Sequence, residues 1–199
     1  MEFREVVRHR RMVHRFERRP VPAEILERIL DVGRRGPTAG YAQGVEFLVL
    51  DEPATVAAFW ELTDDPRFPM EPDEIADAPP VLVMPIPDRE RYLARYSEDD
   101  KAPFGLQVAD AWPVPFWDTD AAMAAMLMLL AAVDEGLGGW FFGIAYGEEA
   151  MLRRFGVPDG MRPIGVVGLG YGLPEEEPTG SGVRRPRRPL DDMLHRNAW

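Results

Sequence analysis

The sequence predicts an α+β fold in one domain that spans residues 1–199. A chain of 199 residues with 46% hydrophobic and 10% aromatic residues is long enough and apolar enough to bury one core. Helical and strand patterns follow each other without the regular alternation that builds a parallel α/β sheet. No strand is followed by G-x-G-x-x-G, which disfavours a Rossmann domain.

Five segments have the pattern of helices. In residues 22–35 the apolar side chains form a stripe at helical spacing, with Pro22 suited to the first turn and Gly36 to the exit. Residues 119–135 carry Ala, Met and Leu on every face and end before a glycine, so we expect a central buried helix there. The other expected helices are residues 2–8, 54–62 and 148–155.

Four apolar runs predict strands. Residues 45–50 have the pattern of a buried strand, and residues 80–84 form a second apolar strand bounded by prolines. Shorter strands are expected at 140–142 and 164–170. The proline-rich and charged stretches 64–77 and 174–188 predict irregular surface connections.

Several classes of site and location are disfavoured by composition. The chain has no cysteine, which excludes disulfides, thiolate metal ligands and cysteine nucleophiles, and its three histidines argue against a multi-histidine metal site. No apolar run reaches the ~18 to 20 residues of a membrane span, and the charged start lacks the apolar core of a signal peptide. We therefore expect a cytoplasmic protein that does not enter a membrane.

Arginines are concentrated at the two ends of an acidic chain. The net charge is -11, but the ends sum to +7 and the middle to -18. Guanidinium groups suit phosphate or carboxylate, so the two clusters can converge on one small anion; solvated tails or ion pairs with the acidic body are the alternative. An acidic body argues against nucleic acid as a partner. The clustered arginines are Arg4, Arg8, Arg10, Arg11, Arg15, Arg18 and Arg19, and Arg184, Arg185, Arg187, Arg188 and Arg196.

Four motifs occur in a characteristic order. They are H-R-R-M-V-H-R-F at 9–16, G-P-T-A-G-Y-A-Q-G at 36–44, G-L-G-G-W-F-F-G-I at 136–144, and P-I-G-V-V-G-L-G-Y-G at 163–172, the last followed by R-R-P-R-R-P-L at 184–190. In this order and spacing the chain resembles the FMN-dependent nitroreductase family over nearly its whole length. The resemblance implies a central mixed or antiparallel sheet flanked by helices, in a homodimer that binds FMN at the subunit interface.

The resemblance also implies which residues hold the cofactor. The family's opening segment, which binds the phosphate, ribityl chain and pyrimidine edge, falls on Arg10, Arg11, Met12 and His14. Its C-terminal basic pair falls on Arg185 and Arg187, so both arginine clusters would address one phosphate. Met12 departs from the usual serine because it has no hydroxyl, and His14 replaces a longer, permanent cation.

A second set of contacts would come from the partner subunit. The family's Pro-Ser-x segment corresponds to Pro37, Thr38 and Ala39, and Thr38 keeps the hydroxyl. Tyr41 replaces a common asparagine, and the Gln43 amide bonds either to the flavin edge or to its own loop.

The glycine-rich motif 136–144 corresponds to the family's backbone beside the reactive flavin nitrogen. There Phe142, Gly143 and Ile144 are expected to offer backbone N–H groups to the negative charge of the reduced ring. Trp140 and Phe141 are expected in the core. In W-P-V-P-F-W, the aromatics Trp112, Phe116 and Trp117 either wall the substrate side of the flavin or plug a dimer interface.

The function implied is ping-pong hydride transfer from NAD(P)H through FMN to an electron-poor acceptor, a nitroaromatic or a quinone. Such chemistry is carried by the cofactor and needs no protein nucleophile. Three alternatives remain open at this point: a flavin-consuming or biosynthetic oxidoreductase of the same fold, a non-catalytic flavin-binding module, and a scaffold that has lost the cofactor.

Overall fold

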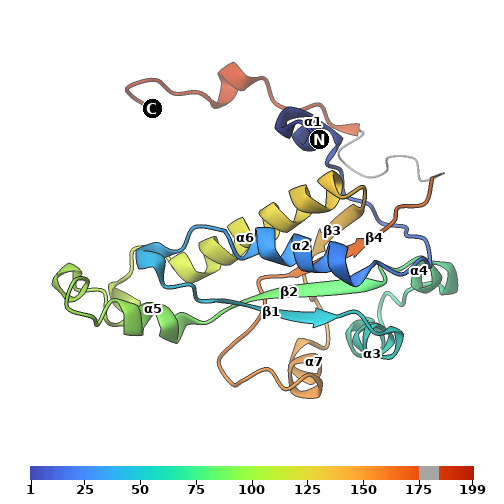
Figure 1. Ribbon diagram of the computed structural model, residues 1–199, viewed down its shortest axis with the longest axis horizontal. Helices are drawn as coiled ribbons and strands as arrows, with labels where there is room; N and C mark the ends of the chain where they lie inside the picture. Colours follow the sequence, from blue (N-terminus) through green and yellow to red (C-terminus); the bar gives the residue numbers. More distant parts are fainter. Residues whose placement is uncertain (175–183) are drawn as a thin grey trace.

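The computed structural model describes residues 1–174 and 184–199, which form a sheet between two layers of helices (Figure 1). Its strands are β1 (Val45–Leu50), β2 (Val81–Pro87), β3 (Gly138–Phe142) and β4 (Val166–Gly170). They lie in the order β1-β2-β4-β3, and each neighbouring pair is antiparallel. The predicted α+β class with an antiparallel sheet is therefore confirmed.

Helices cover both faces of the sheet. In Figure 1, α2 (Ala23–Gly33) and α6 (Phe116–Asp134) lie on one face, and α3 (Pro53–Thr63) and α7 (Glu148–Arg154) lie on the other. The remaining helices are α1 (Phe3–His9), α4 (Pro72–Ala76) and α5 (Arg89–Arg95), with 3-10 turns at Ala39–Tyr41, Ala102–Phe104, Ala109–Ala111 and Leu190–Met193.

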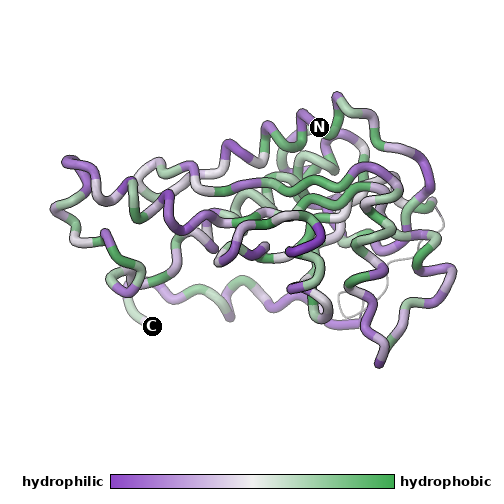
Figure 2. The backbone as a smooth tube through the Cα atoms, turned by 90° about the horizontal axis from the view of Figure 1, so that it is seen from below, coloured by the Kyte–Doolittle hydropathy of each residue, from purple (hydrophilic) through white to green (hydrophobic). Residues whose placement is uncertain are grey.

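Strand β2 is buried on both faces because its side chains alternate between two cores. Val81 and Val83 pack with the α2 and α6 side chains, whereas Leu82, Met84 and Ile86 pack with those of α3 and α7. Hydrophobic residues accordingly gather along the strands in Figure 2, while hydrophilic residues mark many of the outer loops.

Two prolines lie within β2, beyond the predicted end of that strand at residue 84. Strand β4 pairs only with Val81–Val83, so Pro85 and Pro87 have a strand partner on the β1 side alone. A proline lacks the N–H that a second ladder would need, which confines it to such one-sided positions.

Helix α6 corrects the expectation of a helix buried all round. Its buried side chains are Asp120, Ala121, Ala124, Ala125, Met128, Leu129 and Ala132, whereas Met123 and Met126 are 40% and 47% exposed. By length and composition alone, α6 could span a membrane, with a mean hydropathy of 1.5. Its contacts with α2 and β2 are those of a core helix.

Three other expectations are corrected. Strand β1 is only partly buried, since it is an edge strand in which Leu50 alone is buried. The stretch 64–77 holds helix α4, whose start is closed by a capping box between Glu71 and Glu74. Helix α5 was not expected; Asp88 caps it by accepting a bond from the Glu90 N–H. Most of the stretch 174–188 lies outside the described residues.

Candidate functional site

The opening segment lies against β3, although about 130 residues separate them in sequence. Met12 forms an isolated bridge with Gly139, and Val13 N–H donates to Gly139 O at 3.1 Å. Phe141 N–H donates to Met12 Sδ at 3.4 Å. A Cβ at Gly138 would lie 2.8 Å from Val13 Cγ2, so this approach requires glycine. Two of the sequence motifs thus meet.

The polar residues of the opening segment are Arg10, Arg11 and His14. Arg10 follows α1, its N–H donates to Val6 O at 2.9 Å, and its side chain is partly exposed. Arg11 and His14 are exposed, and the His14 ring meets the Trp140 ring edge-on at 5.3 Å. Met12, in contrast, packs against the core, so its thioether serves the fold. Its predicted cofactor contact remains a prediction.

The end of β3 offers backbone donors. Within residues 1–174 and 184–199, the N–H groups of Gly143 and Ile144 have no protein acceptor. A Cβ at Gly143 would meet nothing within 4 Å, so a side chain there would point into open space. The Phe142 ring instead stacks on Trp60, with centroids 5.4 Å apart and planes at 18°. An anionic edge of a flat cofactor would be matched by such backbone donors.

As predicted, Trp140 and Phe141 pack against the core, Trp140 on the α3 side of the sheet and Phe141 on the α2 side. Trp112 is also buried, and its Nε1–H donates to Leu106 O at 2.8 Å. It packs within its own chain against Tyr96, with centroids 4.6 Å apart. Trp112 is therefore not exposed to wall a substrate or plug an interface, whereas Phe116 is 37% exposed.

The loop 37–43 is held at the other end of α6 by a buried carboxylate. Asp120 is 3% exposed, and its Oδ2 accepts from Ala39 N–H at 2.8 Å and from the Tyr92 hydroxyl at 2.9 Å. Burial is the larger cause, and the bond to Asp120 the second, of a pKa of Tyr92 far above its ordinary value. The sequence reasoning missed Asp120; the available signal was an acid that directly precedes the long apolar stretch of α6.

Within this loop, the Thr38 side chain closes a turn. Its Oγ1 accepts from the Gln43 backbone N–H at 3.0 Å, which closes the turn, while the Gln43 side chain is exposed. Tyr41 is 75% exposed with φ of 57°. Pro37 is exposed and Thr38 and Ala39 are half-buried, so the loop presents polar and aromatic groups outward.

The structure keeps this loop apart from the β3 site within one chain. Gly139 packs on Leu129, since a Cβ there would lie 2.7 Å from Leu129 Cδ2. Asp120, which holds the loop, comes nine residues earlier, about 13 Å along the helix axis. One chain therefore holds two groups of predicted site residues apart. They are named here the β3 half-site (10–14 with 138–144) and the loop half-site (37–43 with Asp120).

Arg185 and Arg187 are exposed on the C-terminal segment 184–199, which runs outside the layered body of the domain in Figure 1. Nearby, Arg188 donates to Asp192 O at 2.7 Å. The expected convergence of these arginines with Arg10 and Arg11 on one anion remains a prediction.

Comparison with known proteins places the chain in a family. A model of the nitroreductase family matches residues 7–171. The chain is 28% identical over 202 residues to a protein of Methanothermobacter thermautotrophicus provisionally named NADH dehydrogenase/NAD(P)H nitroreductase, covering 100% of this chain and 88% of that protein.

Two crystal structures share the fold. A nitroreductase family protein from Streptococcus pneumoniae superposes with a TM-score of 0.74 at 19% identity, covering 98% of this chain and 100% of the other. A provisionally named nitroreductase from Desulfovibrio desulfuricans, crystallised with FMN, superposes with a TM-score of 0.70 at 20% identity, covering 100% and 98%. Because the family model spans most of its length, this chain belongs to the nitroreductase family.

Proposed function

We propose that the protein is an FMN-dependent oxidoreductase that takes a hydride from NAD(P)H and passes it to an electron-poor acceptor, a nitroaromatic or a quinone. Family membership supports the oxidoreductase class. The name of the Methanothermobacter protein supports NAD(P)H as donor, and the FMN complex of the Desulfovibrio protein supports the cofactor. FMN, when bound, supplies the hydride chemistry.

The observation that carries this proposal is the pair of backbone N–H groups at Gly143 and Ile144, which have no acceptor among the described residues. They lie at the end of a strand whose start is bonded to the Arg10–His14 segment. In our assignment these N–H groups stabilise negative charge on the cofactor ring, and the guanidinium groups of Arg10 and Arg11 hold its phosphate.

The rest of the site is assigned to a second copy of the chain. Pro37, Thr38 and Ala39 lie on a loop that the same chain holds about 13 Å of helix away from the β3 half-site. In a homodimer, the loop half-site of one protomer would complete the β3 half-site of its partner, with Arg185 and Arg187 adding positive charge. The substrate then enters a cleft to which both protomers contribute.

Absorbance and stopped-flow spectroscopy test the proposal. The protein purified with FMN should be yellow, should bleach when NADH or NADPH is added without oxygen, and should regain its colour on addition of a nitroaromatic or a quinone. If NADH or NADPH is consumed but the yellow colour does not return when either acceptor is added, the proposed transfer is excluded. Tight FMN binding with only slow bleaching would identify a flavin-binding module instead.

A matched pair of variants tests the backbone donors. Gly143→Pro removes the N–H, whereas Gly143→Ala keeps it and adds a methyl group to open space. We expect a slower donor-driven reduction and a lower flavin potential for the proline variant only, since one oxyanion-type donor contributes roughly 3 kcal/mol. Equal behaviour of two variants with unchanged melting temperatures would remove Gly143 N–H from the mechanism.

A further inference from the structure

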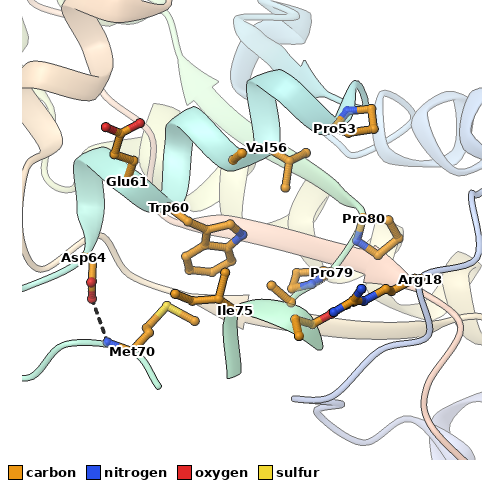
Figure 3. Close-up of a pocket in the computed structure, with 13 residues that line it drawn as sticks. Arg18, Pro53, Val56, Trp60, Glu61, Asp64, Met70, Ile75, Pro79 and Pro80 are labelled. Carbon is orange, nitrogen blue, oxygen red and sulfur yellow. Dashed lines mark hydrogen bonds between the residues drawn. The ribbon is translucent and has the colours of Figure 1, made fainter. Parts of the chain in front are cut away.

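A large apolar cavity lies between α3 and α4, outside both half-sites (Figure 3). Its volume is about 850 Å³, within the range of small-molecule pockets. Apolar side chains form most of the wall: Pro53, Val56, Ala57, Ile75, Pro79 and Pro80. The ring of Trp60 forms the side toward β3 and stacks on Phe142.

The charged groups of this cavity stand at opposite ends. In Figure 3, Arg18 lies at one end, beside Pro79, and Glu61 and Asp64 lie at the other. Arg18 Nε–H donates to Ala76 O at 3.3 Å, and within the described part of the chain its terminal nitrogens pair with no carboxylate. The Asp64 carboxylate accepts from Met70 N–H at 2.9 Å. A ligand therefore meets one cation at one end and two acids at the other.

The cavity wall also holds a buried donor with no acceptor. Trp60 is 9% exposed, and its Nε1–H has no hydrogen-bond partner among the residues described. In Figure 3 this nitrogen is on the side of the ring that faces Val56 and the proline pair. Leaving such a donor unpaired is unfavourable, and an acceptor oxygen on a bound molecule would satisfy it.

We propose that this cavity binds an aromatic monocarboxylate, at a site separate from the proposed flavin site. The apolar walls take the flat ring, while Arg18 and Trp60 Nε1–H supply donors for the carboxylate and for a second acceptor oxygen. Glu61 and Asp64 repel a second negative group at the far end of the cavity. Dicarboxylates and nucleotides are therefore disfavoured, whereas a molecule with a single anionic group is accepted.

Calorimetric titration of the full chain with 2-naphthoate, in the presence of saturating FMN, tests this site. One molecule should bind per chain with a dissociation constant below about 1 mM. Naphthalene-2,6-dicarboxylate should bind at least about tenfold more weakly, because its second carboxylate approaches Glu61 and Asp64. Absence of 2-naphthoate binding, or loss of it only when FMN is added, would overturn the proposal.

Variants locate the binding. Arg18→Gln should weaken 2-naphthoate binding on the order of tenfold, the effect of one charge-assisted hydrogen bond, whereas Arg19→Gln should not. Arg19 is the matched control because its guanidinium stacks on Tyr171, 3.8 Å from the ring centre, and does not line the cavity.

A second variant blocks the cavity itself. Ala57 is exposed on α3, so Ala57→Phe adds a ring to the cavity without entering the core. The Ala57→Phe variant should keep the melting temperature of the native protein and should no longer bind 2-naphthoate. Undiminished binding by Ala57→Phe, or equal weakening by Arg18→Gln and Arg19→Gln, would place the ligand elsewhere.

Discussion

Asp120 connects three segments through a single oxygen atom. Its Oδ2 accepts from the loop at Ala39 and from Tyr92 of α5, and Tyr92 is fully buried. A carboxylate can accept both bonds at once, and a buried hydroxyl without its acceptor is strongly destabilising. The position of the loop half-site therefore depends on one buried acid.

Replacing Asp120 by Ala should destabilise the protein by about 1–3 kcal/mol for each donor that loses its acceptor. Asp120→Asn should lose less, because an amide oxygen still accepts, and Tyr92→Phe should lose least, because it removes donor and bond together. Urea unfolding of the three variants measures the order. A loss from Asp120→Ala no larger than that from Tyr92→Phe would contradict the role of Asp120 in holding Ala39.

The arginines of the opening segment are predicted to recognise a phosphate. Arg10→Ala and Arg187→Ala should weaken FMN binding by about 1.5 to 3 kcal/mol and riboflavin binding much less, since only FMN carries the anion. Fluorescence titration with both flavins gives the comparison. Equal losses for the two flavins would mean that these guanidinium groups act on the fold or on the ring.

At the level of elements, α2 and α6 are joined at the surface by an ion pair. Arg28 donates to both carboxylate oxygens of Glu135, at 2.7 and 2.8 Å. The bond from Arg28 lowers the pKa of Glu135 below its ordinary value of 4.5. A lowered pKa in the folded state means that the pair stabilises the protein above about pH 4.5 and stops doing so as the pH falls through the folded value.

The variant Glu135→Gln should therefore be slightly less stable than the native chain at pH 7, because solvent screens a surface ion pair. The difference should vanish at low pH, where the native carboxylate is protonated too. Thermal unfolding between pH 3 and 7 shows whether the curves converge. Arg89→Gln, which breaks a pair confined to α5, provides the control; a constant offset for Glu135→Gln would exclude the coupling.

The spacing of apolar residues predicted the helices and strands that bury an apolar side. It failed where capping bonds start a helix or where strand order sets the burial of a strand. Helix α2 and all four strands were located by their apolar patterns, with boundaries shifted by a few residues. Helices α4 and α5 are short and charged, so their starts depend on the caps at Glu71 and Asp88 rather than on a stripe. The edge position of β1 depends on strand order, which its own residues do not encode.

The site was predictable only where a motif carries it. The resemblance assigned the opening segment and the glycine-rich motif to the same cofactor, and the structure brings Met12 to Gly139. Asp120 was missed because its partners, Ala39 and Tyr92, are distant in sequence and their approach is a product of the fold. The cavity beside Trp60 was missed for the same reason, since its walls come from four separate stretches of chain.

For the whole molecule, the separated half-sites and the uncovered side of α6 lead to the same arrangement. Met123 and Met126 are three residues apart in the apolar stretch of α6, and both are partly exposed. Phe3 and Val7 are likewise exposed on α1, which contacts α6. Exposed apolar residues on adjoining helices are typical of an interface between subunits, and a dimer through this side would bring each loop half-site toward the partner's β3 half-site.

The predicted dimer is tested by placing a charge on that side of α6. Met126→Glu should yield monomers in sedimentation velocity at micromolar concentration, because burying an unpaired carboxylate in an apolar interface is strongly unfavourable. Ala54→Glu, exposed on α3 across the sheet, should remain dimeric. If each site needs both chains, the Met126→Glu monomer should also lose FMN affinity, while its far-ultraviolet circular dichroism stays native. A monomer that retains full FMN affinity would show that one chain is sufficient to hold the cofactor.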